Sequence, residues 1–304
     1  MIMTYSVIFF GAGASYGSDN MGTPPLGSDL FDDLLSFNAS GWGQIPLDLA
    51  DNFRHDFEEG MKILSKSHPH WMPPLQRAMA AYFFNFVPQP SNLYRKLARG
   101  IVRSNWNGTL STINYERLLE LSLIEEGLRP IFGRSRSNSN EIELCLPHGC
   151  CHLFCESVRG SSSMVSFAGT MVKTNGPIKV LSNPTEFQLR IQNDAFPPVM
   201  SYFEPEKKTT SGASFIDNQR SRFLELVSKA SIVGIIGVKV QPSDNHIWDP
   251  LVKTSARLMY CSGKRGGQEF DVWSKQNRPD NQDITLDGYF ADCFDPLCKE
   301  LNID

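Results

Sequence analysis

Two side chains suited to catalysis each stand at the end of a predicted strand. Asn114 ends the predicted strand 108–114, and His148 directly follows the strand-like stretch 143–147. Ligands bind at the carboxyl ends of strands in open α/β sheets, and imidazole transfers protons near neutral pH. Each residue also has a structural interpretation, because an asparagine can cap the next helix and a single strand-end histidine is more often structural than catalytic. Taken singly, neither residue assigns a reaction.

A glycine-rich loop follows the first predicted strand, residues 5–10. Such a loop presents backbone amides ahead of a helix, and its glycines let a diphosphate come close. The spacing differs from the dehydrogenase pattern GxGxxG, since Tyr16 is followed by Gly17, and a glycine turn without a ligand fits the segment equally well. The loop residues are Gly11, Ala12, Gly13, Ala14 and Ser15.

Together these stretches resemble the SIR2 (sirtuin-related) family. That family has a glycine loop GAG[A/I]S, a TxN motif and a histidine followed by glycine, and here they stand as GAGAS (11–15), TINYE (112–116) and PHG (147–149). The stretch 237–242, GVKVQP, is similar in position and spacing to the family's GTSLxVxP. The resemblance spans most of the chain but is dense only at these four places. It implies a catalytic pair, Asn114 and His148, and a dinucleotide site formed by Gly11, Ala12, Gly13, Ala14, Ser15, Thr112, Glu116 and Gly237.

Departures from the family pattern narrow the expected activity. Deacylating sirtuins carry two CxxC pairs for a structural zinc ion, and no CxxC occurs in this chain. The GIPDFR-like continuation of sirtuins is replaced at 23–30 by TPPLGSDL, which looks like the SIR2-like NAD hydrolases of bacterial antiphage systems. Glu116 stands where aspartate is usual, and Val238 and Lys239 replace small hydroxyl residues, so reduced or altered activity is one expectation.

The cysteines near His148 do not predict a metal site. Cys145, Cys150, Cys151, His152 and Cys155 crowd this segment, but their spacing matches no common zinc module. A packed or partly exposed thiol cluster is the favoured interpretation.

The remaining histidines are interpreted structurally. His68 and His70 are taken as surface residues, and His246 as part of a helix start that Asp244 caps.

The resemblance implies cleavage of NAD+ to nicotinamide and ADP-ribose, as an effector in antiphage defence. NAD+ is then the substrate, and the expected partners are further copies of the chain and a partner protein such as a ring-forming ATPase. Two alternatives stay open: an NAD-dependent protein deacylase, and a subunit that binds NAD or ADP-ribose without turnover.

Strands and helices alternate along the chain in the order that builds a mostly parallel sheet. We predict strands near 5–10, 108–114, 143–147, 231–237 and 256–261, and helices between them. The fold class is a Rossmann-like α/β sheet flanked by helices. One SIR2-like domain spans 1–304, with a helical insertion at about 40–105 and polar flaps at 159–163 and 204–214.

Composition sets the broad class. The 304 residues are 41% hydrophobic and 20% charged with a net charge of −4, so no basic field favours direct nucleic-acid binding. Seven cysteines suit a reducing compartment, and the N-terminal apolar stretch is too short for a membrane span. We therefore expect a cytoplasmic protein that acts on a small molecule.

Overall fold

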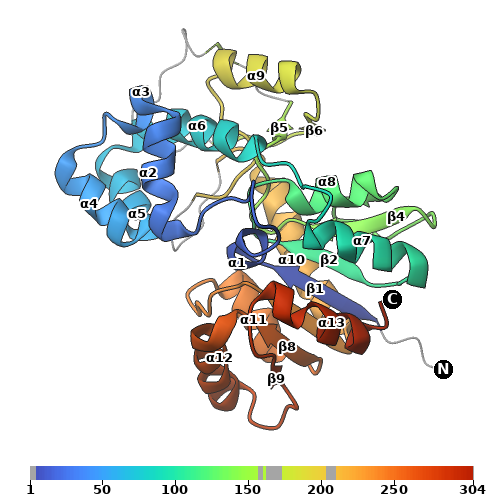
Figure 1. Ribbon diagram of the computed structural model, residues 1–304. Coiled ribbons are helices and arrows are strands. Elements are labelled where there is room, and N and C mark those ends of the chain that lie inside the picture. The colour runs from blue at the N-terminus through green and yellow to red at the C-terminus, as the bar shows by residue number, and fades with distance from the viewer. Residues whose placement is uncertain (1–4, 157–159, 162–172, 203–209, 304) are drawn as a thin grey trace.

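A parallel sheet of seven strands forms the centre of the computed structural model, which describes residues 5–156, 160–161, 173–202 and 210–303 (Figure 1). The strand order is β3-β4-β2-β1-β7-β8-β9, so the chain places β2, β3 and β4 on one side of β1 and then β7, β8 and β9 on the other. This doubly wound order confirms the predicted Rossmann-like class and places the topological switch point between β1 and β7. The strands are β1 Ser6–Phe10, β2 Thr109–Thr112, β3 Arg129–Ile131, β4 Glu141–Cys145, β7 Ile232–Ile236, β8 Arg257–Cys261 and β9 Ile284–Thr285.

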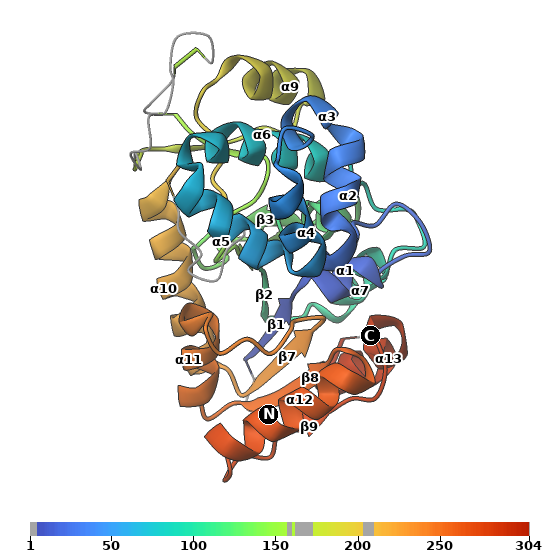
Figure 2. The same ribbon diagram turned by 90° about the vertical axis from the view of Figure 1, so that its left-hand side faces the viewer.

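Both faces of the sheet are covered, as the apolar sequence of β1 requires. All five β1 residues are buried; Val7 and Phe9 belong to one hydrophobic core, and Ile8 and Phe10 to the other. Alternate residues of a strand point to opposite faces, so a run that is apolar throughout indicates helices on both sides. One face is covered by α10 Ala213–Lys229, α11 Asn245–Lys253 and α12 Gly263–Asn277, and the other by α7 Leu93–Ser104, α8 Leu118–Glu125 and α13 Phe290–Leu301 (Figures 1 and 2).

A group of helices extends from one end of the sheet and forms the upper left part of Figure 1. Its interior is aromatic: the rings of Phe31 and Phe53 stack at 5.1 Å, with Trp42 and Phe57 packed around them. In contrast, α7 lies within the predicted insertion range but packs against α8 and α13 beside the sheet. The helices of this group are α2 Gly27–Phe37, α3 Ala39–Trp42, α4 Leu47–His55, α5 Phe57–Ser67, the short 3-10 turn η1 Pro69–Trp71, and α6 Met72–Phe84.

A small antiparallel pair, β5 Leu153–Cys155 and β6 Ile178–Val180, leads into α9 Pro184–Asn193. These elements were not predicted, and neither were β3, β9 and α12. The predicted strand at 143–147 begins two residues earlier as β4. Most of the two polar flaps lies outside the described residues.

No side chain caps the first long helix. Its N-cap residue is Leu26 and α2 begins at Gly27, so Ser28 and Asp29 follow inside the helix. Both residues therefore lie inside the first turn, where the negative charge of Asp29 interacts favourably with the positive end of the helix dipole.

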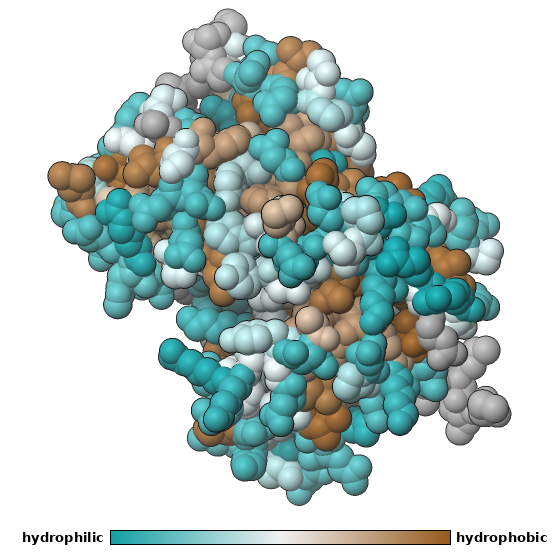
Figure 3. Space-filling model, in the orientation of Figure 1, coloured by the Kyte–Doolittle hydropathy of each residue, from teal (hydrophilic) through white to brown (hydrophobic). Residues whose placement is uncertain are grey.

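Within the described residues, no helix combines the length and the hydropathy that crossing a bilayer requires. The face seen in Figure 3 is mostly hydrophilic, with hydrophobic residues scattered over it.

Candidate functional site

The glycine loop between β1 and α1 (Ala12–Tyr16) is packed against the end of β7. The amide of Gly11 donates to the carbonyl of Ile236 (2.9 Å), and the amide of Gly13 donates to the carbonyl of Gly237 (2.9 Å). Gly237 has a φ of +63°, and a Cβ there would lie 1.9 Å from the backbone nitrogen of Ala14. This approach requires glycine at position 237, and it holds the loop at the switch point before any ligand binds.

Asn114 ties the second motif to the glycine loop. Its side-chain Nδ2 donates to the carbonyl of Gly11 (3.0 Å) and to the hydroxyl of Ser15 (2.8 Å), and its backbone amide donates to Thr112 Oγ1 (3.0 Å). Since α8 begins only at Leu118, the interpretation of Asn114 as a helix cap is wrong. Both amide hydrogens are used inside the protein, which leaves the carbonyl oxygen Oδ1 to accept a hydrogen bond from a ligand.

Glu116 completes a buried network beneath this loop. The Ser15 hydroxyl donates to Glu116 Oε1 (2.5 Å), the Tyr94 hydroxyl lies 3.0 Å from Ser15 Oγ, and the amide of Leu118 donates to the other Glu116 oxygen. Burial raises the pKa of Glu116, although the hydrogen bonds from Ser15 and Leu118 oppose that effect. Glu116 therefore fixes Ser15 and the start of α8 together.

His148 is held at the end of β4 by a tight backbone turn. Gly149 has a φ of +78°, and a Cβ there would lie 1.9 Å from the carbonyl oxygen of Val199. The His148 side chain is 3% exposed and its ring is stacked near Tyr115, with centroids 6.3 Å apart and planes at 29°. Its Nε2 lies 2.8 Å from Nε2 of His246. Close packing of the backbone against Val199 therefore explains why a glycine follows the histidine.

The stretches that carry Asn114 and His148 meet at one edge of the sheet. β2 and β4 run parallel side by side, so their carboxyl ends point the same way. Tyr115, the neighbour of Asn114, contacts His148 by its ring and accepts a hydrogen bond at its carbonyl from the amide of Cys151 (2.9 Å). The structure therefore brings together the three motifs that lie far apart in the sequence. His246 lies at a helix start, as predicted, and Asp244 is the N-cap residue, although its side chain makes no capping hydrogen bond. The contact of His246 with His148 was not predicted.

The cysteines that follow His148 are buried, and Cys150 lies against a pair formed by His152 and Glu120. Cys150, Cys151 and His152 place their ligand atoms within 4.8 Å of one another. The Cys150 thiol donates to the Tyr115 carbonyl (3.2 Å), while His152 lies 3.2 Å from Cys150 Sγ and 2.9 Å from a Glu120 oxygen. Burial lowers the pKa of His152, but Glu120 and Cys150 outweigh it and raise the pKa to about 10. The raised pKa favours an imidazolium–carboxylate pair next to the thiol, a state in which both ring nitrogens carry hydrogens and offer no lone pair to a metal ion.

Cys145 belongs to a different environment. It lies in β4 within the core on the α10 side of the sheet, and its thiol donates to the Gln219 carbonyl (3.2 Å). The thiols near His148 are therefore divided between the two faces of the sheet.

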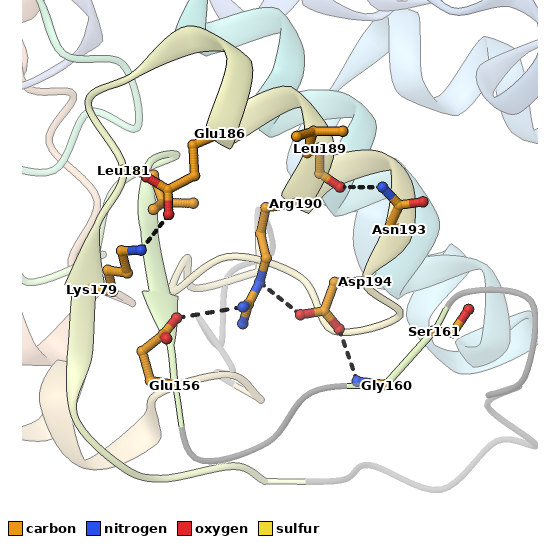
Figure 4. Close-up of a pocket in the computed structure, with 10 residues that line it drawn as sticks. All are labelled: Glu156, Gly160, Ser161, Lys179, Leu181, Glu186, Leu189, Arg190, Asn193 and Asp194. Atoms are coloured by element: carbon orange, nitrogen blue, oxygen red, sulfur yellow. Dashed lines mark hydrogen bonds and ion pairs between the residues drawn. The ribbon is translucent and has the colours of Figure 1, made fainter.

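A pocket of about 410 Å³ lies elsewhere, between the β5–β6 pair and α9 (Figure 4). Arg190 points between two carboxylates there, 3.4 Å from Glu156 and 2.7 Å from Asp194. None of its lining residues belongs to the predicted site. Because the positive charge of Arg190 is balanced by Glu156 and Asp194, this pocket is not an anion-binding site.

No family model matches the sequence, and no curated protein matches it. Solved structures do match by fold. One is a crystal structure of Sir2 with an inhibitor, 2'-O-acetyl-ADP-ribose and a deacetylated peptide: 13% identity, TM-score 0.46, covering 99% of this chain and 95% of that one. A mutant Sir2 homologue with ADP-ribose has 15% identity and a TM-score of 0.45 (98% and 92% covered), and a Sir2 homologue with NAD has 16% and 0.43 (98% and 89% covered). Any assignment of function has to come from the site residues and their contacts.

Proposed function

We propose that this chain is an NAD+ glycohydrolase that cleaves NAD+ to nicotinamide and ADP-ribose. The observation that carries the proposal is the position of Asn114. Its amide bridges the glycine loop at the switch point, while the adjacent Tyr115 packs against His148. A ligand at the carboxyl edge of this sheet would meet the loop, the amide and the imidazole together.

Cleavage of the glycosidic bond of NAD+ does not require a general acid. Nicotinamide leaves as a neutral molecule from a cationic pyridinium, so the cleavage needs a dry pocket, support for an oxocarbenium-like sugar and a positioned water. Asn114 accepts a hydrogen bond from a ribose hydroxyl or the attacking water through Oδ1. His148 takes a proton from that hydroxyl or water.

The cofactor-binding residues act at the other end of the substrate. Gly11, Ala12, Gly13, Ala14 and Ser15 hold the diphosphate, next to Gly237. Thr112 fixes the backbone of Asn114, and Glu116 acts through its hydrogen bond to Ser15.

The biological setting follows from the resemblance at 23–30 to antiphage SIR2-like NAD hydrolases. We propose an effector role in the bacterial cytoplasm, in a homo-oligomer or with a partner such as a ring-forming ATPase.

The test is release of nicotinamide and ADP-ribose from NAD+ by the purified chain. Because a general base typically contributes about 10² to 10⁴-fold, His148→Ala should slow release by about that factor. His55→Ala, at an exposed position at the end of α4, is the matched control and should leave the rate unchanged. Undiminished turnover in His148→Ala contradicts the proposal. Consumption of acetyl-lysine would favour the deacylase, and tight NAD binding without products would favour the non-catalytic subunit.

A further inference from the structure

Two histidines from distant parts of the chain share one short contact. Nε2 of His148 and Nε2 of His246 are 2.8 Å apart although the residues are separated by 98 positions. The ring centroids are 5.0 Å apart with planes inclined at 50°, so the rings meet edge to edge through these nitrogens. Such a contact is attractive only when one of the two nitrogens carries a hydrogen and the other accepts it.

His246 is fixed in place by its helix. It is the second residue of α11, directly after Asn245, and the helix packs into the core beside α10 through Ile247, Trp248 and Leu251. The stretch 237–242, one of the motif stretches, connects β7 to this helix. The imidazole is therefore delivered to the site by the element that follows the switch point.

His148 is fixed from its backbone side. Its carbonyl accepts a hydrogen bond from the amide of Ser201 (2.9 Å), and Arg220 of α10 donates to the carbonyl of Pro147 (3.2 Å). Both rings of the pair are therefore held by packed backbone.

We propose that His246 is a positioning residue for His148 and receives the proton that passes through it. This inference rests on the proposed hydrolase function. In the step, the O–H bond of a ribose hydroxyl or water breaks and its proton binds Nδ1 of His148. The hydrogen on His148 Nε2 moves at the same time to Nε2 of His246. His148 ends neutral, and the positive charge lies on His246, one ring away from the developing charge on the sugar.

The ionisable groups on the elements beside the pair centre on Arg220 of α10, which donates to the carbonyl of Pro147. Asp217 of α10, Asp244 before α11 and the phenol of Tyr115 interact with Arg220, and the Tyr115 ring lies next to that of His148. Burial lowers the pKa of Arg220, while Asp217, Tyr115 and Asp244 oppose that effect. Asp217 and Asp244 thus offset part of the positive charge of Arg220.

His246→Gln tests the proton path, because glutamine keeps a polar group on α11 but cannot take up a proton. We expect kcat for nicotinamide release to fall about tenfold or more, part of what a general base contributes, with KM little changed. In H2O–D2O mixtures the wild-type rate should depend on the deuterium fraction along a curve, because two protons move in the step. The rate of His246→Gln should depend on that fraction linearly, because only one proton moves. His55→Gln is the control and should match the wild type. An unchanged kcat and an unchanged curve in His246→Gln overturn the inference. His246→Asn provides a second variant if the first unfolds at a lower temperature.

A second measurement does not depend on turnover. Coupled histidines titrate in two steps that belong to the pair, so the ring nitrogens of His148, followed by NMR against pH, should show two steps in the wild type and one in His246→Gln. The same titration in both proteins would reject the pair. A wild-type chain that cleaves no NAD+ would instead reject the proposed function, so the two failures are distinguishable.

Discussion

At the scale of single residues, the site depends on side chains that are fully committed to one another. The Ser15 hydroxyl accepts from Asn114, donates to Glu116 and has Tyr94 at its remaining lone pair. A hydroxyl has one hydrogen and two lone pairs, so this one is saturated. The loop that would hold a diphosphate is therefore positioned by a network with no spare partner to replace a lost one.

Asn114→Asp should disable this network without changing its shape. A carboxylate cannot donate to Gly11 or Ser15, and it would add a negative charge beside Glu116. We expect the free energy of unfolding to fall by about 1–3 kcal/mol and NAD+ binding to weaken, measured by urea denaturation and calorimetry. Asn52→Asp is the control, since the Asn52 side chain donates to a helix carbonyl at an exposed position of α4. Equal stability of the two variants would show that the Asn114 contacts contribute nothing.

The sequence identified the motif residues but not what each one contacts. Asn114 and His148 could be predicted because strand ends and family spacing are local signals. The link from Glu116 to Ser15 joins residues 101 positions apart, and the contact of His246 with His148 spans 98. No local pattern encodes such pairs, because the strand order of the sheet creates them.

At the scale of elements, the approach of two strand ends decides the shape of the site. Gly11 and Gly13 both donate to the turn after β7, and Gly237 in that turn faces the start of α1. The absence of a side chain at Gly237 therefore allows the loop at 11–15 to pack against the turn after β7.

Gly237→Ala should separate these two elements. The added Cβ would clash with the Ala14 nitrogen at 1.9 Å, and alanine would have to adopt the positive φ of this position. Gly127→Ala is the matched control, since Gly127 has a φ of +85° and nothing within 4 Å of the added atom. The strain common to both is about 1–2 kcal/mol, so urea denaturation should show a larger loss for Gly237→Ala, together with loss of NAD+ binding. If the two variants lose equal stability, the close packing at 237 is not important.

Elements were predictable where the apolar pattern is strong, and they were missed where packing overrides composition. β1, β7 and β8 are short, mostly apolar runs with clear ends, and β2 is a buried run of threonine, leucine and serine between Gly108 and Asn114. α12 begins GKRGG, whose glycines disfavour a helix, and it forms because Phe270 and Trp273 pack into the core. For α9 a signal existed, since Asn183 accepts from the Glu186 amide ahead of Pro184 at the first turn. β9 is only two residues long and is defined by its neighbour β8.

At the scale of the whole molecule, the two hydrophobic cores lie on opposite faces of one sheet and meet at the site. The core on the α8 side contains the group Cys150, Cys151 and Cys155, and the core on the α10 side contains Cys145 and the helix that carries His246. The proposed pair thus joins an imidazole from the loop after β4 to one from α11. A change in how the helices pack on the sheet would therefore alter the distance between the two rings.

The buried pair of His152 and Glu120 makes the stability of the whole chain depend on pH in a defined direction. The pKa of His152 is raised from 6.5 in the unfolded chain to about 10, so its contribution is fully present below pH 6.5 and is lost as the pH rises through about 10. Between these values the folded chain holds a proton that the unfolded chain has released, and the free energy of unfolding should fall by up to about 1.4 kcal/mol per pH unit from this group. His152→Gln removes the titration, so its stability should fall less than that of the wild type between pH 7 and pH 9.5 in urea denaturation, whereas the exposed control His55→Gln should follow the wild type. Parallel pH curves for His152→Gln and the wild type would mean that the imidazole is neutral in the folded chain, which would return Nδ1 of His152 and the two neighbouring thiols to consideration as metal ligands.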